Sequence, residues 1–285
     1  MEDCHVSHQS STWGHPSTFL GVYDGHGGRD IVNFLQDALH KNVAEEMNVD
    51  DDADINTRLE RAFLITDVQS HMKGIKTSGA TVALCLVERN VVGGASGHDG
   101  DKMSMRVRIH AANSGDGRAV LSCRPSTCTG AGAVVAEEDS GENGGSSFRL
   151  TKDHKADDAE EIDRIENAGG FLLRNRVLGI MAVARSLGDH GMKEFVIGRP
   201  FCRSIEFDLD CSPDDGEEFV IVACDGLWDT MEDEEAVDLV RTFVMDPLID
   251  GDEKEMLRDI AAQMLCSEAM RRGTTDNVTV LVAWL

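Results

Sequence analysis

The 285-residue chain has few basic side chains for its acidity and no long hydrophobic run. Lys and Arg together number 27 against 52 Asp and Glu, which gives a formal net charge of −25 at pH 7. Such a surface repels nucleic acid and anionic membranes and favours cationic partners, metal ions first among them. No apolar stretch approaches the roughly 20 residues of a membrane span, and the first residues, MEDCHVSHQSS, contain no apolar signal core. We therefore expect no nucleic-acid or membrane partner, and a cytoplasmic or nuclear location.

Cysteine is not scarce, but its spacing completes no zinc site. The closest pair, Cys123 and Cys128, has neither a second pair nor neighbouring histidines beside it. Other cysteines lie in or beside apolar stretches, where a thiol behaves as a small hydrophobic group. We predict that all eight are reduced thiols of an intracellular protein.

Apolar runs recur along the chain, so its charge does not indicate disorder. Several of these runs are nearly continuous, which is typical of strands that are buried on both faces. The segments with the length and composition of strands are Thr18–Asp24, Ala80–Val87, Met105–Asn113, Arg118–Cys123, Phe219–Cys224 and Val278–Trp284.

Helical periodicity appears in pairs of segments that lie between groups of strands. Apolar residues recur with helical spacing at 31–47 and 55–63, again at 236–244 and 256–265, and a shorter helix is expected at Ala156–Ala168. This order favours α+β layers over a doubly wound parallel sheet. We expect one domain over residues 1–285, with surface loops at about 93–102 and 126–147. No heptad repeat or exposed aromatic run indicates an obligate oligomer, so we expect a monomer.

Four aspartates stand where rigid strands end beside glycines. Asp24 and Asp225 follow apolar strands and precede Gly25 and Gly226, Asp116 lies in the turn Asn-Ser-Gly-Asp-Gly, and Asp276 immediately precedes the last strand. One such aspartate is ordinary turn chemistry. A group of four predicts clustered carboxylates, whose repulsion a hard divalent cation such as Mg²⁺ or Mn²⁺ would relieve.

Other metal and catalytic motifs fail on spacing. Asp50, Asp52 and Asp54 imitate the start of an EF-hand loop, but Ile55 replaces the required Gly and Arg61 the required Glu. The chain contains no HExxH, P-loop or GxSxG motif, so zinc proteases, nucleotide triphosphatases and serine hydrolases have no local support.

His26 differs from the other histidines in its place between Gly25 and Gly27, directly after Asp24. Its ring would project beside any metal held there. Because histidine titrates near neutrality, it could protonate a leaving alkoxide. A hydrogen-bonded turn histidine is the alternative reading of the same position.

The ordered motifs resemble those of the protein phosphatase 2C family, the metal-dependent Ser/Thr protein phosphatases. The DGHGG element stands at Asp24–Gly28, the DGxWD element at Asp225–Asp229, and the G-(S/T)-xDN-xTV element at Gly273–Val280. Between them, similar elements stand at 78–83, 115–118, 150–170 and 176–189, and the segment from about His154 to Arg203 corresponds to the variable flap of the family. The motifs run in family order over nearly the whole chain.

The resemblance implies an α-β-β-α sandwich, in which two central antiparallel sheets carry helices outside. It also implies two Mg²⁺ or Mn²⁺ ions between the sheets and a weaker third site. The implied metal ligands are Glu2, Asp24, Gly25 through its carbonyl, Asp225 and Asp276, with Asp116, Asp225 and Asp229 at the third site. The implied supporting residues are Asp3, Thr81, Arg176, Asp189 and Asn277.

The implied reaction is hydrolysis of phosphoserine and phosphothreonine in phosphoproteins by a metal-activated water, with Asp24 and His26 as catalytic residues and His26 as the general acid. One departure counts against it: the family's phosphate-clamping Arg, four residues before the metal-binding Glu, precedes the first residue here, so we expect the N-terminal strand to be truncated. A phosphatase-like binding protein without activity is therefore one alternative, and a two-metal phosphoesterase acting on nucleotides or small molecules is another.

Overall fold

The computed structural model describes residues 2–10, 17–92, 104–123, 128–129, 147–210, 218–244 and 251–285. The expected loop at 93–102 lies outside the described residues, as does most of the expected loop at 126–147. Among the helices of the described residues, none combines the length and the apolarity that a membrane span requires.

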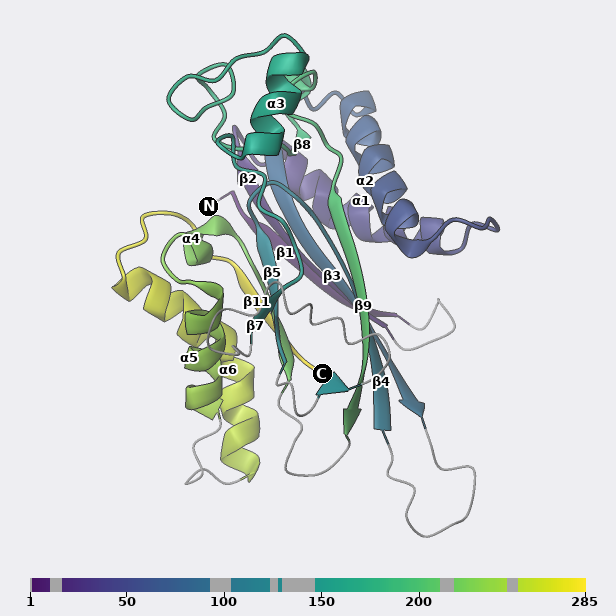
Figure 1. Ribbon diagram of the computed structural model, residues 1–285, viewed down its shortest axis with the longest axis vertical. Coiled ribbons are helices and arrows are strands. Elements are labelled where there is room, and N and C mark those ends of the chain that lie inside the picture. The colour runs from purple at the N-terminus through teal and green to yellow at the C-terminus, as the bar shows by residue number, and fades with distance from the viewer. Residues whose placement is uncertain are drawn as a thin grey trace.

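Two antiparallel sheets form the centre of the molecule (Figure 1). The larger has the strand order β1-β2-β3-β4-β9-β6, with β8 paired to β3, and the smaller has the order β11-β10-β5-β7. The strands of the larger sheet are β1 (Cys4–Ser10), β2 (Ser17–His26), β3 (Gly79–Val92), β4 (Ser104–Ser114), β6 (Cys128–Thr129), β8 (Leu187–Gly188) and β9 (Phe201–Asp210). Those of the smaller sheet are β5 (Arg118–Ser122), β7 (Ser147–Arg149), β10 (Phe219–Ala223) and β11 (Val280–Trp284).

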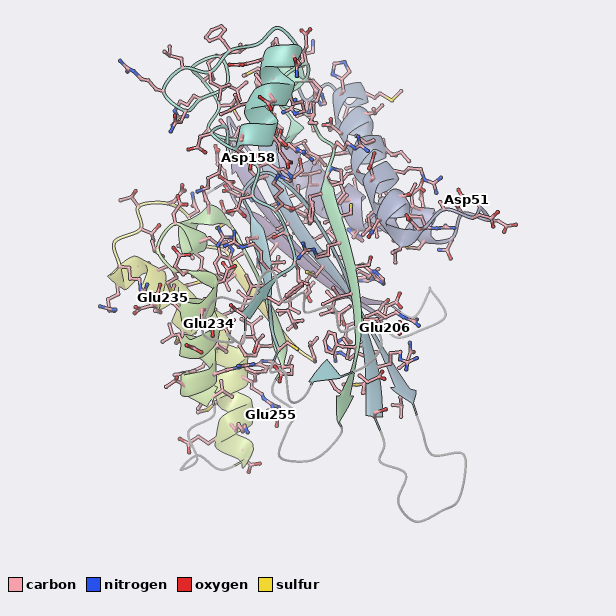
Figure 2. All side chains as sticks on the ribbon, viewed as in Figure 1. Asp51, Asp158, Glu206, Glu234, Glu235 and Glu255 are labelled. Carbon is pink, nitrogen blue, oxygen red and sulfur yellow. The ribbon has the colours of Figure 1, made fainter. Side chains whose placement is uncertain are left out.

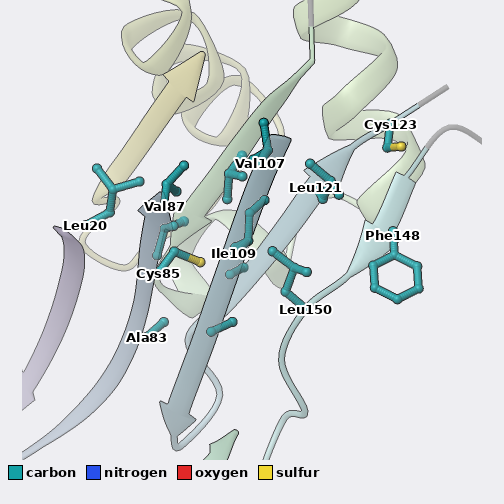
Figure 3. Packing of buried hydrophobic residues seen from close by; sticks show 14 of the residues in the cluster. Leu20, Ala83, Cys85, Val87, Val107, Ile109, Leu121, Cys123, Phe148 and Leu150 are labelled. Atoms are coloured by element: carbon teal, nitrogen blue, oxygen red, sulfur yellow. The ribbon is translucent and has the colours of Figure 1, made fainter. Parts of the chain in front are cut away.

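Alternating side chains of the strands fill the space between the sheets. On β3, Ala83, Cys85 and Val87 belong to the core between the sheets, whereas Val82 and Leu84 pack toward the helices on the other face. Figure 3 shows β3 and β4 side chains converging with Leu121 of the smaller sheet. Both faces of the central strands are therefore buried, as their nearly continuous apolar sequences predict.

A pair of helices covers the outer face of each sheet (Figure 1). The apolar stripes of α1 (Asp30–Met47) and α2 (Ile55–Met72) pack on the larger sheet, and those of α5 (Asp233–Val244) and α6 (Gly251–Arg271) pack on the smaller one. This arrangement is a four-layer α-β-β-α sandwich, and it confirms the predicted fold class.

The flap, residues 154–203, forms a lobe at one end of the sandwich (Figure 1). It contains α3 (Ala159–Asn167) and the 3₁₀ turn η1 (His190–Met192) and has a small core of its own. The short helix α4 (Asp225–Trp228) lies at the same end of the smaller sheet. The flap therefore stands over the strand ends that carry the predicted site.

The cysteines correct one sequence-based prediction. Cys4, Cys85, Cys202, Cys224 and Cys266 are free thiols, as predicted. Cys123 is disulfide-bonded, so the prediction that every cysteine is reduced is wrong there. A buried sulfur is small and apolar in either redox state, and an apolar environment therefore cannot distinguish the two.

Candidate metal centre

A cavity of about 410 Å³ opens at the end of the sandwich beneath the flap. It brings together most of the residues that the sequence singles out: Glu2, Asp24, Gly25, His26, Thr81, Asp116, Arg176, Asp225, Asp276 and Asn277. Flap residues Ile180–Val183 complete the lining. Three expected residues, Asp3, Asp189 and Asp229, do not line it.

Both sheets contribute carboxylates to this cavity. Asp24 lies near the end of β2, opposite Thr81 of β3. Asp116 occupies the tight turn between β4 and β5, Asp225 begins α4 just after β10, and Asp276 lies in the segment that leads into β11. These strand ends meet where the two sheets pack together. Carboxylates that are far apart in the sequence therefore lie close to one another in the structure.

The carboxylates of the cluster repel one another in a poorly hydrated space. Burial, followed by the charge of Asp225, raises the pKa of Asp24, whose carboxyl lies within hydrogen-bonding reach of that of Asp225. Burial likewise raises the pKa of Asp225, with further contributions from Asp276 and Asp229. Asp116 is raised to a pKa of about 7 by burial and by Asp225. A bound cation would relieve the repulsion among these crowded carboxylates and would favour their ionised forms.

The donor atoms fit a hard divalent cation. Asp225 Oδ1 is buried and has no hydrogen-bond partner, and the same holds for Asp3 Oδ1 just behind the cavity. An all-oxygen set of this type suits Mg²⁺ or Mn²⁺. Among the described residues, no group of three or more Asp, Glu, His or Cys side chains is arranged so that it could hold a metal ion unaided. A cation here would also need backbone or water ligands, which is the usual situation for Mg²⁺.

The two ends of the described chain meet at this site. Asp3 is buried, and its Oδ2 accepts a hydrogen bond of 2.8 Å from Thr279 Oγ1 near β11. A Cβ added to Gly25 would lie 2.7 Å from the backbone oxygen of Glu2, so only glycine allows this close approach. Glu2 is thereby placed beside the Asp24 loop.

Asp229 lies apart from the cavity lining and has a partner of its own. Its Oδ1 accepts a hydrogen bond of 2.8 Å from Lys155 Nζ. Burial alone would lower the pKa of Lys155, but the bond to Asp229 and the nearby charge of Asp116 raise it. Sequence reasoning gave Lys155 no role, because nothing in the local sequence relates it to a residue 74 positions away.

His26 faces the cavity and is held from behind. Its Nε2 donates a hydrogen bond of 2.7 Å to Asp189 Oδ2, and the Asp189 side chain is only 8% exposed. The same carboxylate oxygen accepts a hydrogen bond of 2.5 Å from Ser186 Oγ. The sequence resemblance implies that Asp189 is a supporting residue. It predicts neither the hydrogen bond between Asp189 and His26 nor the hydrogen bond from Ser186.

Arg176 carries a guanidinium to the cavity from the flap. Its side chain is anchored by a hydrogen bond of 2.8 Å from Nη1 to the carbonyl oxygen of Ile180. A planar cation on the wall of an acidic cavity is suited to phosphate oxygens.

Comparison with known proteins decides the family. The family model of protein phosphatase 2C matches residues 1–278. The chain belongs to the protein phosphatase 2C family. It is 33% identical to protein phosphatase 2C homolog 1 of Saccharomyces cerevisiae, over 100% of this chain and 88% of that protein. It is 32% identical to protein phosphatase 2C homolog 1 of Schizosaccharomyces pombe, over 99% of this chain and 68% of that protein.

Solved structures share the fold of this chain. A phosphatase from Toxoplasma gondii superposes with a TM-score of 0.70 at 21% identity, over 99% of this chain and 88% of that one. A sex-determining protein of Caenorhabditis elegans gives the same TM-score and identity, over 99% of this chain and 61% of that one. Membership of the protein phosphatase 2C family supports protein phosphatase activity, and with it a phosphoprotein substrate.

Proposed function

We propose that this protein hydrolyses phosphoserine and phosphothreonine in phosphoproteins with the help of Mg²⁺ or Mn²⁺. One observation carries the proposal: carboxylates from both sheets meet in an open cavity beside His26 and Arg176. The raised pKa values of Asp24 and Asp225 and the unpartnered Asp225 Oδ1 support a cation there rather than a simple turn network. The same grouping argues against a binding protein whose catalytic site has decayed.

The residues divide into those that would hold metal and those that would handle the phosphate ester. Asp24 would be common to two cations, with the Gly25 carbonyl, Glu2, Asp225 and Asp276 as further ligands. Asp116 and Asp229, with Asp225, would hold a weaker third cation. When bound, such cations would supply an activated water and neutralise charge on the phosphoryl oxygens.

The remaining cavity residues handle the substrate. Arg176 would bind phosphate oxygens through its guanidinium. His26 would donate a proton to the departing serine or threonine oxygen, which is a poor leaving group without it. Asp3, Thr81 and Asn277 would position the carboxylates from behind or beside them. The partner is then a phosphoprotein, with the protein acting as a monomer in the cytoplasm or nucleus.

Phosphate release from a phosphoserine peptide in Mn²⁺, with and without a chelator, tests the proposal. We expect metal-dependent turnover in the wild-type protein and its loss in Asp225→Asn. Asp238→Asn, on the exposed part of α5, is the matched control and should retain turnover. Metal binding without turnover would instead favour the phosphatase-like binding protein. Hydrolysis of nucleotides but not of phosphopeptides would favour the phosphoesterase.

A further inference from the structure

We propose that Asp189 is a positioning residue that fixes the ring of His26, so that Nδ1 and not Nε2 faces the substrate. This inference rests on the proposed function in one respect, because it assigns the proton donor within the same reaction. It goes beyond that function by naming the reacting nitrogen and the groups that select it.

The hydrogen bond to Asp189 determines which ring nitrogen remains for the substrate. Nε2 of His26 is engaged with Asp189 Oδ2 at 2.7 Å, while the ring itself lines the cavity. A carboxylate oxygen can only accept, so Nε2 carries a hydrogen in this arrangement. Nδ1 is then the nitrogen that can give a proton to the leaving oxygen, and the neutral ring left behind is already the correct tautomer.

Asp189 is itself held too firmly to be an incidental partner. Its side chain is 8% exposed, and Ser186 Oγ donates to the same Oδ2 at 2.5 Å. Its backbone N–H donates to the Ser78 carbonyl oxygen at 3.1 Å. The first contact comes from within the flap and the second from the residue just before β3, so Asp189 is fixed through both its side chain and its backbone.

The backbone at the hydrogen bond between His26 and Asp189 is strained. Asp189 has φ of 47°, a left-handed conformation that only a minority of non-glycine residues adopt. A Cβ added to Gly79 would lie 1.9 Å from Asp189 Oδ2, so β3 can pass here only as glycine. Strained backbone conformations are often found at functional sites. Here the strained conformation of Asp189 places its carboxylate against the imidazole of His26.

The kinetic test compares two leaving groups in Asp189→Asn, an isosteric change that removes the negative charge shared by the contacts with His26 Nε2 and Ser186 Oγ. We expect turnover of an alkyl phosphate, the phosphoserine peptide, to fall about 10- to 100-fold, and turnover of an aryl phosphate with a good leaving group to fall less than about 3-fold. His26→Gln should show the same selectivity. The double variant should match His26→Gln within about twofold, because Asp189 acts through the ring.

A second readout does not depend on turnover. In the Mg²⁺-loaded protein, ¹⁵N NMR of labelled histidine should show His26 Nε2 protonated and hydrogen-bonded to a carboxylate, and Asp189→Asn should shift the Nε2 resonance because the charged acceptor is gone. His190→Gln is the control: it follows Asp189 in the chain but bonds to Ser70, and it should change neither measurement. If Asp189→Asn does not fold, Ser186→Ala should show a smaller loss with the same leaving-group selectivity.

Three results would overturn the inference. One is equal slowing of both substrates in Asp189→Asn; another is a double variant far slower than His26→Gln, which would make Asp189 a structural support only. The third is an Nε2 resonance that is unchanged in Asp189→Asn. If the wild-type protein shows no metal-dependent turnover at all, the proposed function fails, and the NMR measurement still decides how the ring is held.

Discussion

Among the described residues that line the cavity, Arg176 contributes one guanidinium beside several carboxylates. It extends from the flap, while the carboxylates of the cavity come from the sheets and their flanking turns, and its contact with the Ile180 carbonyl keeps it on the cavity wall. In the proposed function, a guanidinium placed there would attract the phosphate group and would take no part in holding metal. Removing it should therefore separate substrate binding from metal binding.

We expect Arg176→Met to raise KM for a phosphoserine peptide by about tenfold or more, the cost of one charge-assisted hydrogen bond. Metal affinity, measured by calorimetry, should stay unchanged. Arg174→Met is the matched control, since Arg174 is also an exposed flap residue but does not line the cavity. Equal effects of the two substitutions on KM would show that Arg176 acts only through general charge.

The individual site residues show how far the sequence could predict this cavity. The strand-end aspartates could be identified because an apolar strand followed by Asp-Gly leaves a carboxylate at a rigid edge. The partners of His26 and Asp229 could not, because Asp189 lies 163 positions from His26 and Lys155 lies 74 from Asp229. Such contacts are fixed by how the flap folds back over the sheets, and no local pattern encodes that.

At the scale of single elements, the flap depends on a buried carboxylate. Glu161 of α3 is 1% exposed and accepts hydrogen bonds from Arg185, at 2.8 Å to its Nε, and from Arg164 at 2.9 Å. Burial alone would raise the pKa of Glu161, but the two guanidinium groups outweigh it and lower the pKa. The ionised form is therefore favoured in the folded flap, and it ties α3 to the segment that approaches the cavity.

A lowered pKa means stability that is present at neutral pH and lost in acid. We expect the flap to be stabilised by Glu161 above pH about 4.5, its ordinary pKa, and to lose this as the pH falls further. Glu161→Gln should weaken the flap by about 1.5–3 kcal/mol at pH 7. Hydrogen exchange of flap peptides across pH measures both effects, and the difference between the two proteins should shrink below pH 4.5.

Glu160→Gln provides the control for that series. Glu160 is the neighbouring residue, but it is exposed and pairs only with the surface amine of Lys152 among the described residues. Its loss should change exchange in the flap very little, because exposed ion pairs contribute little. A flap equally sensitive to both substitutions would contradict the role given to Glu161.

The elements that the sequence predicted and those that it missed differ in their surroundings. The six predicted strands are confirmed because their faces are apolar. β9 was missed because its outer face carries Glu206 and Asp208, which pair across the strand with Arg108 and Arg106 of β4. β1 was missed because its sequence, CHVSHQS, is largely polar and it ends the sheet. Pairing with an adjacent strand, not local composition, makes both segments strands.

At the scale of the whole molecule, metal should contribute to stability as well as to chemistry. The site joins the two sheets, and without a cation its carboxylates repel across that junction. Mg²⁺ at about 100 times its Kd should stabilise the folded protein by about 2.7 kcal/mol. Thermal unfolding should show a rise of several degrees with Mg²⁺, reversed by a chelator. Asp225→Asn should lose this rise and Asp238→Asn should keep it; a rise that survives in Asp225→Asn would place the stabilising ions elsewhere.

Acidic side chains also lie well away from the cavity. Figure 2 labels examples on the flap, on both helices of the smaller sheet's outer layer, on β9 and before α2: Asp158, Glu234, Glu235, Glu255, Glu206 and Asp51. With the net charge of −25, they give the protein a negative field that extends well beyond the cavity.

This field predicts a preference among substrates. Phosphopeptides with basic flanking residues should have a higher kcat/KM than matched peptides with acidic flanks, by about 3- to 10-fold at low salt. The difference in kcat/KM should shrink in about 0.5 M salt, because dissolved ions screen the charges on the protein surface. Equal rates at low salt would mean that the surface charge does not steer substrates.

The hydrogen bond between Thr279 and Asp3 has a consequence in time. It spans 276 residues, and the carboxylates of Glu2 and Asp24 likewise wait for Asp276. At synthesis rates of about 5–20 residues per second, that wait is on the order of 10–50 s. Throughout it, the nascent chain would carry only part of the proposed metal site. With the proposed site, full-affinity cation binding would require that β11 has docked, and a chain still on the ribosome would lack the assembled site.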